Sequence, residues 1–275
     1  MPLLRRDFLK GAAAASAATA LAPKLSATTP PSAGRDYYEL RRYRLAPGAS
    51  PALLDGYLES ALLPALDKLG IRNTGVFTEL EVDKAAGTSA PKPGSPTWML
   101  IPHASLDSFV RVSATLNADP AVLAAGEPYL QAPKAAPAFE RIDTWLLLAF
   151  QGMPRLELPA FSRDRVPTRV FEMRTYESHG ELKALNKMAM FDDGEIEVMR
   201  DLGMNPVFFG QALAGSDLPH LTYITSGPDL TSHLAAWKKF GADPRWQKMR
   251  SDPRYADNVS KNTPRFLAPK AYSGI

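Results

Sequence analysis

The sequence predicts an α+β protein built from two copies of one strand–helix–strand–strand–helix–strand unit. Residues 38–43 (YELRRY) share the pattern aromatic-Glu-apolar-Arg-any-Tyr with residues 171–176 (FEMRTY). At the same spacing, Leu-Gly-Ile at 69–71 is matched by Leu-Gly-Met at 202–204. Self-similarity at a fixed spacing indicates a tandem duplication of one structural unit, and the chain length suits two small domains.

The composition excludes several classes of function. Apolar and charged contents of 45% and 22% are ordinary for a globular protein. The absence of cysteine excludes a disulfide framework, a thiolate zinc site and a cysteine nucleophile. Residues 1–27 hold four of the 32 basic residues and one of the 29 acidic ones, so 28 of each remain in the body. Because the body is balanced, we expect no nucleic-acid partner.

The N-terminus predicts an export signal. Residues 4–10 (LRRDFLK) resemble the twin-arginine signal pattern, although Leu4 stands where Ser or Thr is usual. The alanine-rich run that follows is too short and too weakly apolar to span a bilayer, which takes about 20 residues. The alternative, a disordered Ala-rich tail, does not explain the ordered Arg-Arg-x-Phe-Leu-Lys. We therefore expect a signal peptide at 1–27, cleavage between Ala20 and Ala27, a spacer at 28–36, and a periplasmic or extracytoplasmic protein without a stable membrane span.

The first unit is predicted at residues 37–150. Its first strand is 37–44; a Pro47-Gly48 turn and a Ser50-Pro51 helix start then lead into a helix that ends at Gly70 and is kinked by Pro64. Alternation and apolar runs predict further strands at 74–82, 97–102 and 139–150, with a helix at 106–116 and a surface loop at 83–96.

The second unit is predicted at residues 169–275, after a proline-rich linker at 151–168. Strands are expected at 169–177, 207–213, 221–225 and 265–272, and helices at 181–202 and 230–240. The first of these helices is expected to break at Asp192-Asp193-Gly194. Its predicted inward positions are Leu182, Leu185, Met188, Ala189, Ile196 and Met199.

Each unit has the order of a ferredoxin-like domain, a four-stranded antiparallel sheet with helices on one face. The uncovered face must be either buried or solvated. Two copies in one chain predict that the two bare faces meet, which gives an intramolecular pseudo-dimeric α/β barrel. We expect Glu39, Arg41, Tyr43, Glu172, Arg174 and Tyr176 to face the barrel interior, since they alternate with apolar residues.

Three segments together resemble the NIPSNAP family of the dimeric α/β-barrel superfamily: residues 171–176, 202–210 (LGMNPVFFG) and 237–246 (WKKFGADPRW). The resemblance is strong over 169–275 and visible over 37–150 only through the repeat. It implies the fold rather than a chemistry, because family members have no settled enzymatic activity and some are discussed as interaction proteins. The wider superfamily includes monooxygenases, haem-degrading enzymes and peroxidases.

The Glu-x-Arg-x-Tyr phrase is the leading ligand-binding candidate, in both copies: Glu39, Arg41, Tyr43, Glu172, Arg174 and Tyr176. One interpretation is a hydrogen-bonded network that fixes how the structure packs, because a buried charge is kept only when it is partnered. The other is a pocket where arginine binds an anion and tyrosine donates a proton. Duplication of the phrase favours the structural interpretation.

The remaining candidates are aromatic residues and one histidine. Trp237 and Trp246, with Phe240, suit packing around the Asp243-Pro244 helix start better than an aromatic ligand platform. His179 follows the second motif strand and is more typical of a helix cap or surface residue than of a site. The histidine spacing predicts no metal site, and no phosphate loop or dinucleotide fingerprint predicts a cofactor.

Three functional hypotheses follow. The first is an exported protein that binds an unidentified small molecule or protein partner. The second is a cofactor-poor monooxygenase or haem-handling enzyme, suggested by fold analogy alone. The third is a structural scaffold, which a barrel without a cavity of about 300 Å³ would favour. Homo-oligomer formation stays open in all three.

Overall fold

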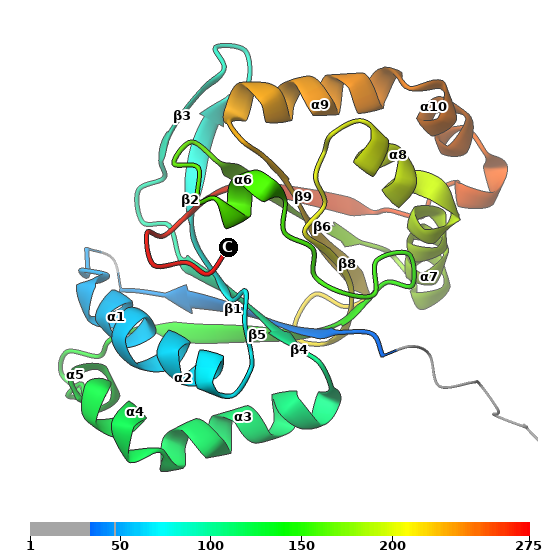
Figure 1. Ribbon diagram of the computed structural model, residues 1–275. Coiled ribbons are helices and arrows are strands. Elements are labelled where there is room, and N and C mark those ends of the chain that lie inside the picture. Colours follow the sequence, from blue (N-terminus) through cyan, green and yellow to red (C-terminus); the bar gives the residue numbers. More distant parts are fainter. Residues whose placement is uncertain (1–33, 47) are drawn as a thin grey trace, which may run out of the picture. The chain divides into compact units, whose positions relative to one another are not determined.

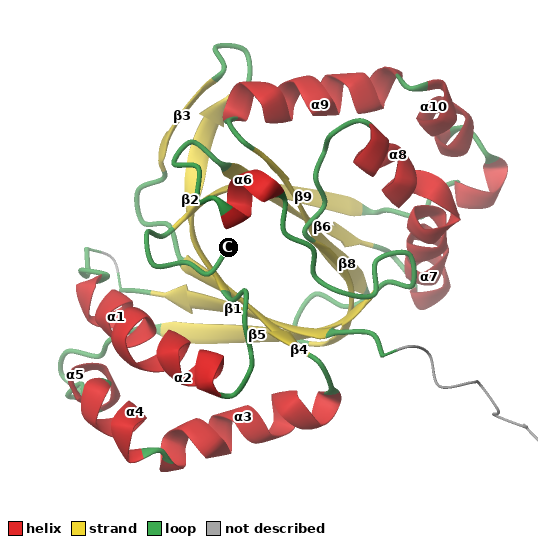
Figure 2. Ribbon diagram, viewed as in Figure 1, coloured by secondary structure: helices red, strands yellow, loops and turns green. Residues whose placement is uncertain are grey.

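Eight antiparallel strands close into a barrel, and helices cover its outside (Figure 1, Figure 2). The computed structural model describes residues 34–46 and 48–275. The predicted signal peptide, residues 28–33 of the predicted spacer and Pro47 lie outside the described residues. Within the described part of the chain, no helix is both long enough and apolar enough to cross a membrane.

The first half follows the predicted order of elements, with one added hairpin strand. Its elements are β1 (Tyr37–Arg44), α1 (Ala52–Tyr57), a π-helical turn (Leu58–Leu62), α2 (Leu63–Lys68), β2 (Gly75–Asp83), β3 (Thr88–Pro91), β4 (Thr97–His103), α3 (Leu106–Ala118), α4 (Pro120–Ala125), α5 (Glu127–Leu130) and β5 (Arg141–Ala149). The strand β3 lies in the predicted surface loop and pairs only with the end of β2. The predicted kink is a π-helical turn that ends two residues before Pro64.

The second half repeats that order. Its elements are α6 (Ala160–Arg163), β6 (Val170–Glu177), α7 (Glu181–Met190), a π-helical turn (Phe191–Glu195), α8 (Ile196–Asp201), β7 (Phe208–Ala214), β8 (His220–Gly227), α9 (Leu230–Ala242), α10 (Pro244–Arg250), a short 3₁₀ turn (Pro253–Tyr255) and β9 (Lys261–Pro269). The predicted break at residues 192–194 is confirmed, because Gly194 has a φ of 139°. The segment predicted as an irregular linker contains the one-turn helix α6.

Two reciprocal strand pairings join the halves. The strand order is β2-β4-β1-β5 in the first half and β7-β8-β6-β9 in the second. The last strand of the first half, β5, pairs with β7, and the last strand of the second half, β9, pairs with β2. Each sheet edge is therefore bonded to the other half, which closes the barrel and leaves neither seam open to water.

The barrel interior is filled by the apolar members of the alternating strands. Tyr38 and Leu40 of β1 and Phe171 and Met173 of β6 lie in the central apolar cluster. Figure 1 shows the C-terminal end of the chain inside the ring of strands, where Ile275 joins the same cluster. Two further clusters lie between the sheet and the helices of each half.

The expected orientation of the repeated polar phrase is wrong. The six residues face the helices rather than the barrel interior: Glu39, Arg41, Tyr43, Glu172, Arg174 and Tyr176. Tyr43 and Tyr176, for example, belong to the two outer clusters. The predicted alternation of polar and apolar residues is therefore correct, but the face assigned to the polar residues is wrong. An eight-stranded barrel has an interior only wide enough to be filled by side chains, and apolar side chains fill it without needing partners. The polar phrase lies on the outer face, where helices supply its partners.

The buried face of α7 also differs from the prediction. Leu182 and Leu185 are 81% and 49% exposed, and Ala189 is exposed as well. Met188, Ile196 and Met199 are buried as expected. The helix is rotated because it directs Lys187 inward, where its Nζ lies 2.7 Å from Glu195 Oε2. A buried ion pair, which no apolar pattern reveals, fixes the orientation of this helix.

We expect Gly215 to be required for the turn between β7 and β8. Its φ of 131° is strained for other residues, and a Cβ there would lie 2.2 Å from the Trp145 ring. Gly215→Ala should therefore lower the free energy of unfolding by about 1–3 kcal/mol in urea denaturation. Gly241→Ala is the control, because Gly241 lies in α9 with open space around it and alanine should stabilise that helix by about 0.5–1 kcal/mol. Equal stability of both variants would contradict the assignment.

Candidate functional site

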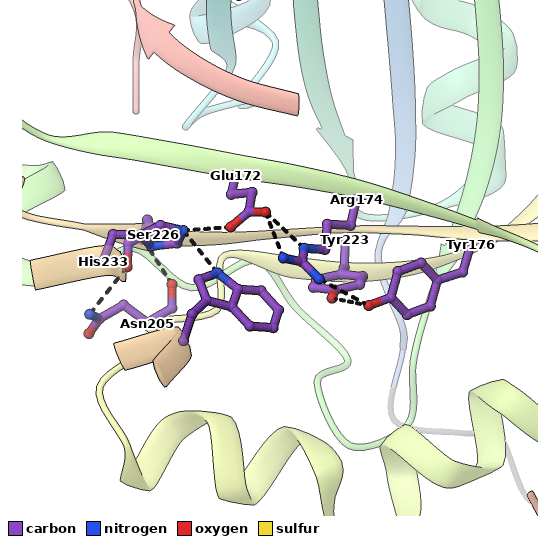
Figure 3. Close-up of polar contacts among 8 residues, drawn as sticks. Glu172, Arg174, Tyr176, Asn205, Tyr223, Ser226 and His233 are labelled. Atoms are coloured by element: carbon purple, nitrogen blue, oxygen red, sulfur yellow. Dashed lines mark hydrogen bonds and ion pairs between the residues drawn. The ribbon is translucent and has the colours of Figure 1, made fainter. Parts of the chain in front are cut away.

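A polar network lies between β6 and α9 in the second half (Figure 3). The carboxylate of Glu172 is fully buried, and its Oε1 accepts from Arg174 Nε at 2.9 Å and pairs with Nη2 at 2.8 Å. Its Oε2 lies 2.8 Å from Nε2 of His233, which α9 supplies. Both carboxylate oxygens are therefore partnered by groups that carry or can carry positive charge.

The network continues from Arg174 to the aromatic residues around it. The guanidinium lies 3.6 Å from the ring centre of Trp237, a cation–π contact. Its Nη1 donates to the hydroxyl of Tyr176 at 3.5 Å, and that hydroxyl lies 2.9 Å from the hydroxyl of Tyr223 on β8. The polar side chains of the phrase on β6 therefore have interaction partners on α9 (His233 and Trp237) and on β8 (Tyr223).

The electrostatics keep Glu172 ionised. Burial would raise the pKa of this carboxyl, but the hydrogen bond from His233 and the charge of Arg174 outweigh burial and hold the pKa below its usual value. We assign the His233 Nε2 proton to this bond. The Trp237 N–H, 3.1 Å from the same nitrogen, then faces a donor rather than an acceptor. Nδ1 of His233 has no partner among the described residues.

The first half contains a second network of the same composition. Arg41 Nε donates to Glu39 Oε1 at 2.5 Å, and Arg41 Nη1 donates to the Tyr43 hydroxyl at 3.3 Å. His103 Nε2 lies 3.5 Å from Glu39 Oε2. Here too burial raises the pKa of the carboxyl, and His103 and Arg41 more than offset that effect. Both copies are therefore buried Glu–Arg–Tyr groups with a histidine beside the carboxylate.

The two histidines come from different elements, which is why sequence reasoning missed them. His103 is the last residue of β4, whereas His233 lies on α9. Aligning the two repeats cannot pair these residues. The pairing of β4 with β1 brings His103 to Glu39, whereas the packing of α9 on the sheet brings His233 to Glu172.

Of the other predicted site residues, Trp237 lines an open groove of about 460 Å³ together with Arg174. Trp246 packs on Phe240 with ring centres 4.6 Å apart, and Phe240 contacts Trp237 with ring centres 5.7 Å apart. His179 is exposed, just before α7. The two polar networks lie in separate outer clusters. The candidates therefore form two structural networks rather than one shared site.

A cavity of about 160 Å³ lies inside the barrel, at the end where β1 and β6 finish. The rings of Trp98 and Trp145 form one wall, with centres 6.0 Å apart. Sequence reasoning proposed none of its lining residues, which are Leu40, Arg42, Trp98, Trp145, Thr175, Glu177, Asp217, His220, Thr222, Lys261, Thr263 and Arg265. Arg42 and Thr175 occupy the "any residue" position of the repeated phrase. The sequence signal that could have located the cavity is therefore this position, where the two copies carry different residues.

Two polar groups at this cavity have no partner among the residues that the structure describes. They are Nε2 of His220 and Nη1 of Arg265. Burial lowers the pKa of His220, so its ring is neutral at pH 7. Buried polar groups are normally hydrogen-bonded, and an exception calls for an explanation such as a ligand or water. No group of three or more His, Asp or Glu residues in the described ranges is arranged to hold a metal ion.

Glu172→Gln should destabilise the fold by about 3–5 kcal/mol at pH 7, because it leaves Arg174 and His233 without their anion. Glu197→Gln is the matched control, since Glu197 is exposed on α8 and should change stability by less than about 0.5 kcal/mol. The measurement is the free energy of unfolding in urea. Equal effects of the two substitutions would contradict a structural role for Glu172.

The same variant should alter the pH dependence of stability. Because the folded-state pKa of Glu172 lies below 4.5, its ionised form stabilises the fold fully above about pH 4.5, and this stabilisation is lost as the pH falls through the folded-state value. Glu172→Gln should therefore lose less stability than the native chain on acidification. Unfolding midpoints from about pH 7 to pH 3 measure this difference.

Comparisons with known proteins agree with the fold and with the two sequence resemblances. Residues 171–274 match the NIPSNAP family model, and residues 5–22 match the model of the twin-arginine translocation pathway signal sequence. A search of curated proteins gave no match.

Solved structures of similar fold include a "putative monooxygenase" from Lactobacillus acidophilus, with 7% identity, a TM-score of 0.51, and coverage of 86% of this chain and 94% of that one. A protein of the same description from Fusobacterium nucleatum has 6% identity, a TM-score of 0.50, and coverage of 86% and 93%. An uncharacterized NIPSNAP-like domain protein from Burkholderia xenovorans is 18% identical over 39% of this chain and 90% of its own, with a TM-score of 0.35.

At such low identities, the first two likenesses show a shared α/β barrel fold and nothing about chemistry. The family model covers the half of the chain that carries the Glu172 network. The second half of this chain is therefore a NIPSNAP domain, in a protein that also carries a twin-arginine signal sequence for export.

Proposed function

We propose that this protein is an exported binding protein that takes a small organic molecule into the cavity at the end of its barrel. The observation that carries the proposal is the pair of partnerless polar atoms, His220 Nε2 and Arg265 Nη1, beside a wall of two tryptophans. Binding sites in proteins combine apolar walls with a few placed polar groups in this way. By contrast, both oxygens of the Glu172 carboxylate are partnered by Arg174 and His233, and Oε1 of Glu39 is paired with Arg41.

The architecture we propose is a pair of ferredoxin-like units at 37–150 and 169–275, joined by a linker at 151–168, that form an intramolecular pseudo-dimer. In support, the strand orders β2-β4-β1-β5 and β7-β8-β6-β9 are the same order in two halves, and the seams β5–β7 and β9–β2 are reciprocal. We also propose a periplasmic location after cleavage between Ala20 and Ala27. Assembly into a homo-oligomer is compatible with this arrangement.

The size of the cavity bears on the scaffold hypothesis. At about 160 Å³ it is smaller than the ~300 Å³ typical of pockets for drug-sized ligands, so the volume by itself favours a scaffold over a binding protein for ligands of that size. It shares Arg42, Thr263 and Arg265 with a wider groove of about 560 Å³, so the two spaces adjoin. A small ligand can therefore enter from the groove and occupy the cavity. Haem is too large for the cavity, so a haem-handling role is not supported at this position.

A cofactor-poor oxygenase is the second candidate, favoured by one feature of the cavity. His220 is buried and neutral, and its Nε2 has no partner among the described residues, so it could remove a proton from a phenolic substrate held against the tryptophans. Oxygen uptake by the purified protein with added hydroquinone, abolished by His220→Gln, would support this role. Absence of uptake leaves binding as the function.

Thr263→Phe should abolish binding of small aromatic probes, because Thr263 lines the cavity and a phenyl ring would fill it. Asn262→Phe is the matched control, since the neighbouring position on β9 points to the opposite face of the strand. The measurement is isothermal titration of the purified exported protein with phenol, benzamide and benzoate. If none of the three binds the native protein, the proposed function is wrong.

A further inference from the structure

We infer that the barrel cavity selects a small organic carboxylate, with its charged group on Arg265 and its apolar body against Trp98 and Trp145. This inference rests on the proposed function, because it names the ligand class of the same site. It follows from three features of the cavity: its balance of charge, the orientation of its tryptophans, and its volume.

The cavity has one cation that lacks a hydrogen-bonded carboxylate. Of the charged lining residues, Lys261 Nζ is paired with Glu177 at 2.7 Å. Arg42 is paired with Asp143 at 2.8 Å. Asp217 is exposed at the rim, where the Ser216 hydroxyl donates to it. Arg265 is therefore the lining cation that is left to bind the charged group of a ligand.

The acid nearest to Arg265 is already occupied. Arg265 Nε lies 3.8 Å from Glu79 Oε1, beyond hydrogen-bond distance. Glu79 accepts from Lys92 Nζ at 2.6 Å and from Trp98 Nε1 at 2.9 Å. Nη1 of Arg265 is itself buried and has no hydrogen-bond partner among the described residues.

Burial of Arg265 is consistent with a missing anion. Burial lowers the pKa of this guanidinium, since the charged form loses water without gaining a close carboxylate. A ligand carboxylate would replace that water and could accept two parallel N–H bonds, which is the geometry that a guanidinium favours.

The tryptophan rings carry a cation already: the guanidinium carbon of Arg42 lies 5.6 Å from the centre of the Trp98 ring and 5.3 Å from that of the Trp145 ring. Trp98 Nε1 donates to Glu79 and Trp145 Nε1 donates to the carbonyl of Ser216, so both indole N–H groups are used elsewhere. The guanidinium carbon of Arg265 lies 5.2 Å from the centre of the Trp98 ring. A ligand whose carboxylate meets Arg265 therefore places its remaining atoms beside this aromatic wall.

The volume limits the ligand to a small molecule. A space of about 160 Å³ holds roughly five water molecules at ~30 Å³ each, or one small ring with a substituent. His220 Nε2 and the hydroxyls of Thr222 and Thr263 provide further polar positions in the lining. Benzoate fits these requirements, and benzamide has the same shape without the charge.

Isothermal titration with benzoate and benzamide tests this inference on the purified exported protein. We expect benzoate to bind about tenfold or more tightly than benzamide, which corresponds to one charge-assisted hydrogen bond. Arg265→Gln should remove that preference while benzamide binding persists, and Arg265→Lys should retain part of it. Arg44→Gln is the control, because Arg44 lines the outer groove but not the cavity and should leave the ratio unchanged.

Each outcome is decisive. Equal binding of benzoate and benzamide by the native protein, which needs no variant to fold, overturns the inference and leaves the proposed function intact. A benzoate preference that survives Arg265→Gln overturns the role of Arg265. Binding that persists in Thr263→Phe places the probe outside the cavity and overturns the inference. Failure of both probes to bind overturns the inference, and if phenol also fails to bind, the proposed function itself is wrong.

Discussion

The structure depends on one constraint: each half has a sheet with helices on only one face, and the bare faces and edges must be hidden. The two seams β5–β7 and β9–β2 meet both needs together, because pairing the edges also brings the bare faces together. The outcome is a continuous barrel with one filled interior and two outer helix layers. Unpaired backbone groups at a sheet edge and apolar faces in water are both unfavourable. Closure of the barrel within one chain pairs the edges and buries the apolar faces.

Closure then decides where polar groups can lie. The narrow interior accepts apolar side chains without partners, and so the Glu-x-Arg-x-Tyr phrase occupies the outer face, under helices that bring His233 and Trp237. At the end of the barrel the packing is incomplete, and the residues between the members of the phrase, such as Arg42 and Thr175, line the space that remains. The repeated residues build the structure, and the residues that differ between the repeats shape the cavity.

Much of the architecture was predictable because it depends on local sequence patterns. Alternation located the strands, Gly70 and Gly203 end helices with φ values of 77° and 76°, and Asp243 caps α10 as expected. The orientation of α7 was not predictable, because a buried Lys187–Glu195 pair overrides the apolar period. The face of the phrase was also misjudged, since alternation separates two faces but does not say which one becomes the interior.

By itself, the sequence predicted a duplication and determined the order of elements, the export signal and the resemblance of residues 169–275 to the NIPSNAP family. These features depend on residue spacing and on short motifs, which can be recognised in the sequence without knowing which residues are in contact. Only the tertiary structure decided which histidine meets which carboxylate, and that Trp98, Trp145, His220 and Arg265 surround one cavity. Those residues come from β4, β5, β8 and β9, and only closure of the barrel makes them neighbours.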